Sequence, residues 1–148
     1  MRWTGSDRTF IGAQRVAHMA TADAGGEPHV IPVCFVFDGE NFYTAVDQKR
    51  KRVPPDQLRR IRNLRENAQV ALLLDEYQED WSRLRYLLVR GKASLVEAEG
   101  ERRRAFHRLE EKYAQYREVD LQNSLGPLIR IDPESVHRWH ALEKPEEP

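Results

Sequence analysis

The chain has few of the features that mark several large classes of protein. It contains a single cysteine, Cys34, so no internal disulfide can form, and this usage fits a reducing compartment. No stretch approaches the ~20 consecutive apolar residues that span a bilayer. The opening segment MRWTGSDRTFIG has no apolar signal region. We therefore expect a cytoplasmic protein without a membrane partner.

A surplus of charge of one sign is also missing. The chain has 24 Lys and Arg against 24 Asp and Glu, so its net charge does not point to a nucleic-acid partner. The motifs GxSxG, HExxH, the P-loop and GxGxxG are all absent, which leaves hydrolase, metalloprotease, nucleotide-triphosphatase and Rossmann interpretations without support. His107, His137 and His140 lack the partner spacing of a known metal site, and we expect no metal.

The length of 148 residues suits one domain with its own core and is short for two. We therefore expect a single domain over residues 1–148. Its ends, residues 1–6 and 141–148, are expected to fray as chain termini.

The apolar pattern predicts a mainly β protein, a small antiparallel barrel decorated by helices. A short helix over 7–13 would be capped by Ser6. The run 30–37 is nearly all apolar, so both faces of this strand should be covered and two hairpins should share it. About six strands and two or three helices are expected: strands over 14–21, 30–37, 41–46, 69–74, 84–97 and 128–139, the last interrupted by Asp132-Pro133, and helices over 7–13, 57–66 and from Gly100 onward.

The stretch 29–52 is the most informative, because an apolar strand pair leads directly into four consecutive cations. An apolar surface beside an anion-binding segment suits a ligand with an aromatic end and a phosphorylated end. Residues 47–66 hold eight cations against three acids, a local surplus of five. Phosphate or multi-carboxylate binding and an ordinary solvated basic face explain this surplus about equally well.

Two single residues invite a functional interpretation. Cys34 has no neighbouring histidine or cation in the sequence, so a small buried hydrophobic residue is favoured over a nucleophile. Trp81 lies in the acidic loop DEYQEDWSR, where a tryptophan in solvent is costly, so we expect it to cover an interface or a ligand.

Three blocks carry a family resemblance: RVAHMATADAGGEPHVIPVCFVFDGENFYTAVDQKRKR, IRNLRENAQVALLLDEYQEDWSRLRYLLVRGKASL and PLIRIDPESVHRW. In order and spacing they resemble the pyridoxamine 5′-phosphate oxidase-like split β-barrels, which bind flavin or the deazaflavin coenzyme F420. The resemblance covers roughly residues 8–140. It is strongest to the small F420-dependent branch, in which the loop around Trp81 has a counterpart.

The resemblance implies a homodimer with two cofactor sites at the subunit interface. The cofactor ring would lie along the strand pair, the basic loop would hold its phosphate, and the following helix would support its tail. The inserted VPPDQLRRI leaves open which cation touches phosphate. The implied cofactor-binding residues are Ile31, Val33, Cys34, Phe35, Tyr43, Thr44, Ala45, Lys49, Lys51, Arg52, Asn63, Arg65 and Trp81.

The charge surplus favours F420 over FMN, because F420 presents several anions over a longer reach. With F420 the reaction would be a hydride transfer to a small conjugated or heteroaromatic substrate. Two alternatives stay open: an FMN-dependent oxidase or reductase, and a flavin-, F420- or haem-binding module without turnover. Tyr43 and His29 are the candidate proton donors, and the sequence does not identify the substrate.

Overall fold

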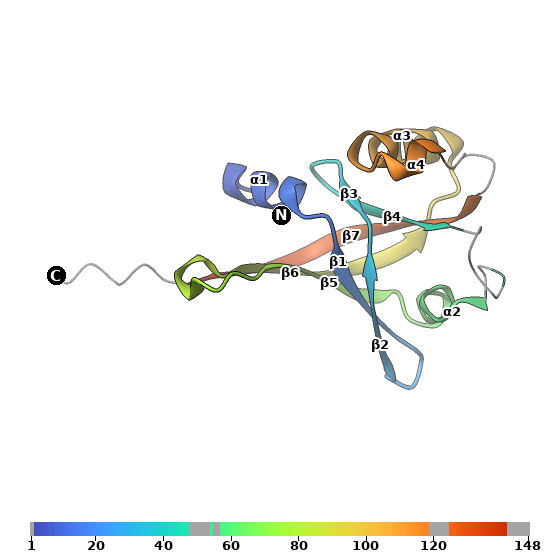
Figure 1. Ribbon diagram of the computed structural model, residues 1–148. Coiled ribbons are helices and arrows are strands. Elements are labelled where there is room, and N and C mark those ends of the chain that lie inside the picture. The colour runs from blue at the N-terminus through green and yellow to red at the C-terminus, as the bar shows by residue number, and fades with distance from the viewer. Residues whose placement is uncertain (1, 48–53, 55–56, 119–124, 142–148) are drawn as a thin grey trace.

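The computed structural model describes residues 2–47, 54, 57–118 and 125–141. Seven strands form one antiparallel sheet in the order β2-β1-β5-β6-β7-β4-β3, with helices over it (Figure 1). None of the helices in these residues is long and apolar enough to cross a membrane. The elements are α1 Gly5–Ala13, β1 Ala17–Ala22, β2 Pro28–Val33, β3 Val36–Phe37, β4 Phe42–Asp47, α2 Arg59–Glu66, β5 Gln69–Glu76, the 3-10 turn η2 Trp81–Arg83, β6 Arg85–Leu95, α3 Glu99–Lys112, α4 Gln115–Glu118 and β7 Leu125–His140.

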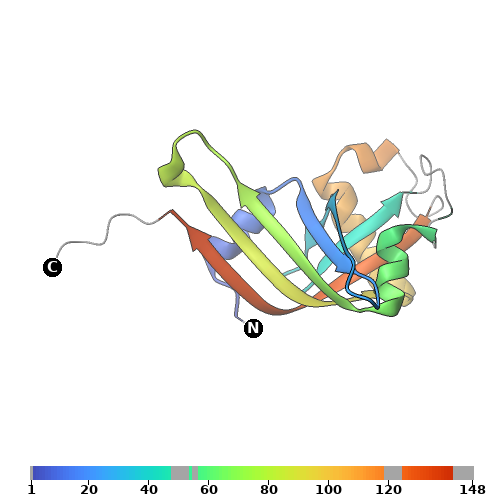
Figure 2. The same ribbon diagram turned by 90° about the horizontal axis from the view of Figure 1, so that it is seen from below.

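The curl of the sheet follows from its connectivity. β2 and β3 lie at opposite edges of the sheet, yet only Cys34 and Phe35 separate them in the chain. Two intervening residues span at most about 11 Å, so the two edges must approach each other at this point. Figure 2 shows the strands wrapping accordingly. The predicted mainly β fold of split-barrel type is confirmed, with seven strands instead of about six.

The inside of the curl holds the main core. On β1, Ala17 and Met19 point inward and are fully buried, while His18 between them is half-buried on the outer face. The same alternation places Leu72 and Leu74 of β5 inside. Each of the larger side chains, such as Met19 and Leu72, contributes about 1.5–3 kcal/mol when it is removed from water. This core therefore holds the sheet in its curled form.

A second core lies between α3 and the outer face of β4. Tyr43 on β4 packs in one cluster with Phe106 and Leu109 of α3, whereas its neighbour Phe42 points into the main core. The predicted helix from Gly100 onward is confirmed as α3, and its apolar face forms this core. β4 is covered on both faces because α3 lies over it.

The expected long strand over 30–37 is wrong, because the chain turns at Cys34 and forms two short strands. The hairpin of β1 with β2 is confirmed by their pairing, which runs from Ala17 opposite Val33 to Ala22 opposite Pro28. The outer face of β2 is open, and Val30 is 64% exposed. Of the two strands that form this run, β3 is covered on both faces and β2 is not. The apolar composition of the run therefore reflects two different environments in succession.

The Asp-Pro pair does not interrupt β7, which corrects the prediction. The pairing of β7 with β4 ends at Ile131, and its register against β6 shifts between Arg90 and Gly91. Pro133, which has no N–H to donate, therefore lies where β7 pairs only with β6 and where a bulge relaxes the pairing.

Trp3 and Thr4 make defined contacts, which differs from the expectation that residues 1–6 fray, and Met1 lies outside the described residues. Trp3 packs edge-on against the ring of Phe37 at 5.1 Å between centroids. Thr4, and not Ser6, caps α1, since its Oγ1 accepts from the N–H of Asp7 and its own N–H donates to the Asp7 carboxylate. At the other end, Ala141 donates its N–H to the carbonyl of Leu84, and residues 142–148 lie outside the described residues.

Candidate functional site

The predicted anion-binding region centres on α2. Lys49, Lys51 and Arg52 lie outside the described residues. The helix begins at Arg59, two residues later than expected, and its N-cap Leu58 forms no side-chain cap bond. Its exposed side carries three arginines, and within the described residues none of them has an ion pair. These arginines are Arg59, Arg62 and Arg65.

Two polar contacts fix α2 against the β1–β2 hairpin. Asn63 is 1% exposed, and its Nδ2 donates to Oγ1 of Thr21 on β1 at 3.0 Å. Glu66 accepts the N–H of Ala24 in the turn at 3.0 Å. Asn63 thus positions the helix, and Arg65 points to solvent. The arginines of α2 are held at the end of the barrel where β1 and β2 meet (Figure 1).

Most of the side chains predicted to lie along the cofactor ring are covered within this chain. Phe35 is 1% exposed, and its N–H donates to the hydroxyl of Tyr113 at 3.0 Å. What β2 presents to solvent is its other face, with Val30 and Pro32. The other residues predicted to lie along the ring form two groups. The buried ones are Val33, Tyr43 and Thr44, and the half-buried ones are Ile31, Cys34 and Ala45.

The two candidate proton donors differ in their surroundings. The hydroxyl of Tyr43 donates to the Glu101 carboxylate at 2.9 Å. Burial and this carboxylate raise the pKa of Tyr43 to about 12, which makes its phenol a weaker acid than usual. His29 is half-buried on β2, next to the exposed Val30. Of the two side chains, that of His29 is the more exposed.

Trp81 lies on η2 in the β5–β6 connection and is 68% exposed. Its indole N–H donates to the hydroxyl of Tyr77, itself 63% exposed, at 3.4 Å. No other part of the described chain covers this pair. Its predicted role at an interface or ligand stays a prediction.

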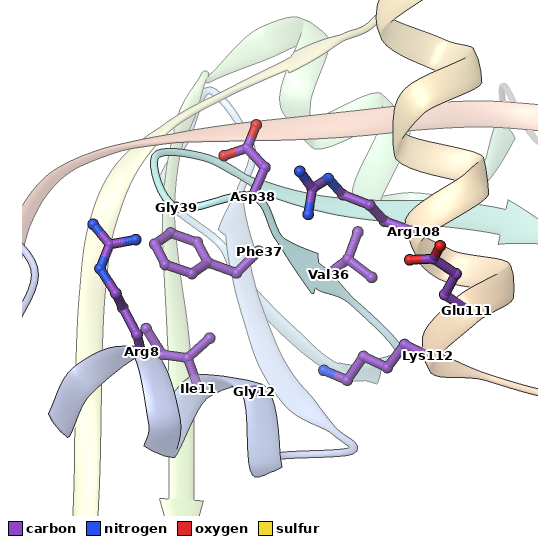
Figure 3. Close-up of a pocket in the computed structure, with 10 residues that line it drawn as sticks. All are labelled: Arg8, Ile11, Gly12, Val36, Phe37, Asp38, Gly39, Arg108, Glu111 and Lys112. Carbon is purple, nitrogen blue, oxygen red and sulfur yellow. The ribbon is translucent and has the colours of Figure 1, made fainter. Parts of the chain in front are cut away.

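A cavity of about 440 Å³ lies between α1, the β3–β4 turn and α3 (Figure 3). Its apolar side chains come from α1 and β3, and three cations line it: Arg8 of α1 and Arg108 and Lys112 of α3. The sequence alone did not reveal this site. The spacing of four residues between Arg108 and Lys112 was a visible signal, since it places both on one helix face. Arg8 comes to the same cavity as these two residues only through the tertiary fold.

Lys112 has an unusual environment for an amine. Its Nζ lies 3.7 Å from the centroid of the Phe35 ring. Burial, with a further contribution from Arg15, lowers the pKa of Lys112 to about 8. A substantial fraction of the amine is therefore neutral at mildly alkaline pH.

The residues at the α2 end fit a ligand with an aromatic ring and an anionic tail. Guanidinium groups without carboxylate partners suit phosphate and carboxylate oxygens. The exposed Val30 and Pro32 offer an apolar surface in the same hairpin to which α2 is bound. Together, the arginines and this apolar surface suit a flavin or deazaflavin cofactor.

A curled antiparallel sheet whose two edges meet through a two-residue link defines a split β-barrel protein. The pyridoxamine 5′-phosphate oxidase family model matches residues 4–140. The chain belongs to this family.

Three relatives show the range of proteins that the chain is similar to. A 5a,11a-dehydrotetracycline/5a,11a-dehydrooxytetracycline reductase from Streptomyces rimosus is 29% identical over 94% of this chain and 84% of its own length. HutZ, the haem storage protein of Vibrio cholerae, is 23% identical, with 95% of both chains covered and a TM-score of 0.72. An FAD-binding protein from Mesorhizobium loti is 19% identical, with 92% and 94% coverage and a TM-score of 0.67.

Proposed function

We propose that this protein is an F420-dependent reductase of the cytoplasm that acts on a small conjugated or heteroaromatic substrate. The observation that carries the proposal is the similarity, over 94% of the chain, to a reductase of a conjugated polycyclic compound. Its family membership agrees with an oxidoreductase that binds a flavin-like cofactor. When bound, F420 would supply the hydride.

The residues of the chain would bind and orient this cofactor. Arg59, Arg62 and Arg65 are free to hold an anionic tail, and their spread along α2 favours the long F420 tail over the single phosphate of FMN. The ring would lie against the exposed face of β2, where Val30 and Pro32 exclude water. The side chain of His29 lies on the opposite face of this strand.

We also propose a homodimer formed through the outer face of the sheet. α3 covers β3 and β4, but the outer face of β2, β1, β5 and β6 has no helix over it among the described residues. This face is apolar for a solvent surface, and Tyr86 stacks on Trp139 there at 5.4 Å between ring centroids. Such a face suits a subunit interface. Its apolar members are Ala20, Val30, Leu73, Tyr86, Leu88 and Trp139.

Titration of the purified protein with F420 and with FMN, followed by absorbance and fluorescence, tests the cofactor. We expect micromolar binding of F420 and weaker binding of FMN. Turnover is then measured as oxidation of reduced F420 with 5a,11a-dehydrotetracycline and other conjugated acceptors. Lack of binding by F420 at micromolar concentration would exclude the proposal.

Two alternatives have their own signatures. The similarity to an FAD-binding protein supports an FMN-dependent enzyme. Such a protein would be yellow as purified and would show no response to added F420. The similarity to a haem storage protein supports a binding module, which would bind cofactor or haem stoichiometrically and transfer hydride to none of the acceptors.

A further inference from the structure

The cavity of Figure 3 is a separate site from the basic face of α2 and lies away from it. It adjoins the β3–β4 turn, at the end where β4 begins, whereas β4 ends toward the segment that leads to α2. The six residues of β4 span about 17 Å between these ends. The cavity volume of about 440 Å³ falls in the range of small-molecule sites.

The cations of this cavity are available for a ligand. Within the described residues, the side chains of Arg8 and Arg108 form no hydrogen bond or ion pair. Lys112 is held only over the rings of Phe35 and Tyr113. Three cationic groups from two helices thus face one cavity without a bound carboxylate, an arrangement that an anion would stabilise.

The two acids of the cavity are engaged elsewhere. Oδ1 of Asp38 accepts the N–H groups of Glu40 and Asn41 at 2.8 and 2.7 Å, which fixes the β3–β4 turn. Glu111 pairs with His107 at 3.0 Å on the exposed side of α3. Three cations less two acids leave a surplus of one positive charge in the lining, which matches a monoanion better than a dianionic phosphate.

The remaining surface is apolar. Ile11 of α1 and Val36 and Phe37 of β3 line the same cavity, so a bound anion would meet hydrocarbon as well as charge. Figure 3 shows Phe37 between Arg8 on one side and Arg108 on the other. A ligand that satisfies this lining has a charged head and an apolar body.

We propose that this cavity binds a small organic monocarboxylate with an apolar body, such as an arylalkanoic acid. The carboxylate lies between Arg108 and Lys112, which are one helical turn apart, and the guanidinium donates two parallel N–H groups to it. The apolar body packs on Ile11, Val36 and Phe37. This site is independent of the proposed reductase activity, since none of the residues assigned above to the cofactor lines it.

Calorimetric titration of the protein without added cofactor tests the site. The probes are 4-phenylbutyrate and its uncharged counterpart 4-phenylbutanamide, which share the same apolar body. We expect the carboxylate to bind at least about tenfold more tightly, because only it makes charge-assisted hydrogen bonds. Equal affinities, or no binding of the carboxylate at millimolar concentration, would overturn the proposal while leaving the cofactor titrations unaffected.

Matched variants locate the binding. Arg108→Gln should weaken phenylbutyrate about tenfold and leave the amide unchanged. Arg104→Gln is the control, because Arg104 is exposed on the same helix and does not line the cavity. Lys112→Met keeps the stem over Phe35 and should weaken the carboxylate similarly. An equal loss in Arg104→Gln, or no loss in Arg108→Gln, contradicts the assignment, and thermal melting verifies that each variant is folded.

Discussion

Asp7 and Arg138 join the first helix to the last strand by a partly buried, forked ion pair. Nε and Nη2 of Arg138 donate to the two oxygens of Asp7 at 2.8–3.0 Å, and Asp7 is 1% exposed. The same carboxylate closes the capping box of α1 with Thr4. The pair connects residues 131 positions apart in the chain, so it ties α1 to the sheet.

Asp7→Asn should therefore destabilise the fold. The amide retains a cap acceptor but loses the charge-assisted bonds to Arg138, and we expect a loss of about 2 kcal/mol in the free energy of unfolding. Denaturant unfolding measures it. Glu134→Gln on β7 is the control, because Glu134 is exposed, and its change should be close to zero. Equal stability of Asp7→Asn and wild type would show that the ion pair contributes nothing.

The same pair gives a pH dependence with a defined sign. Burial by itself would raise the pKa of Asp7, but the hydrogen bonds from Arg138 and Thr4 outweigh it, and the pKa is lowered overall. A lowered folded-state pKa contributes stability above the usual aspartate pKa, and this stability is lost as the pH falls through the folded-state value. The stability gap between wild type and Asp7→Asn should accordingly shrink in acid. A gap that widens would contradict the assignment.

Gly91→Ala should destabilise the protein strongly. A Cβ at this position would overlap the carbonyl oxygen of Asp132 on β7, at the bulge beside Pro133. Because the obstacle is backbone in a paired strand, relief requires the two strands to separate, at a cost of about 2–4 kcal/mol. Gly12→Ala is the control, since nothing lies near its added methyl group. Similar melting temperatures for the two variants would contradict the close approach.

The main lines of the fold could be predicted from the sequence because they rest on local patterns. The β1–β2 hairpin followed from Asp23 to Gly26 between apolar runs, and α3 followed from the helical spacing of its apolar residues. The break at Cys34 could not be seen in the sequence. An apolar run has the same composition whether it forms one strand covered on both faces or two successive strands that pack against different cores. The predicted interruption of the last strand at Pro133 was wrong for a similar reason. Only the tertiary pairing shows that β7 needs no N–H group at this position.

The candidate site was predictable only in part. The basic surplus of residues 47–66 located α2 correctly as a cationic helix, yet the inward turn of Asn63 toward Thr21 depends on where β1 lies. The cavity between α1 and α3 escaped notice because Arg8 and Arg108 are 100 positions apart in the sequence. A charge cluster assembled from two distant helices leaves no contiguous signal.

Lys112 should lose its proton at lower pH than an ordinary lysine. Burial and Arg15 lower its pKa to about 8, and Cys34 is the neighbour that acts in the opposite direction. Acylation requires the neutral amine, so the rate of modification of Lys112 should reach half its maximum near pH 8. Mass spectrometry after pulses of acetic anhydride at several pH values measures it. A midpoint near the ordinary lysine pKa of about 10.4 would refute the prediction.

Val30→Asp should dissociate the proposed dimer without unfolding the subunit. Val30 is 64% exposed, so a carboxylate there is solvated in the monomer but would lose water in an apolar interface. Light scattering on a sizing column is expected to give twice the chain mass for the wild type and the chain mass for the variant. Arg90→Gln, on the same face but already polar, is the control. A wild type that elutes as a monomer would remove the proposal of a dimer.

The cationic segment before and along α2 should control cofactor affinity. Lys51→Ala with Arg52→Ala removes two cations of the basic loop, and Arg62→Gln with Arg65→Gln removes two from the exposed side of the helix. If both regions hold the anionic tail, each pair should weaken F420 about tenfold or more, and the loss should diminish at high salt. Arg103→Gln with Arg104→Gln, at two exposed positions of α3, also removes two cations and controls for net charge. Unchanged F420 affinity in both pairs would make this segment an ordinary solvated basic surface.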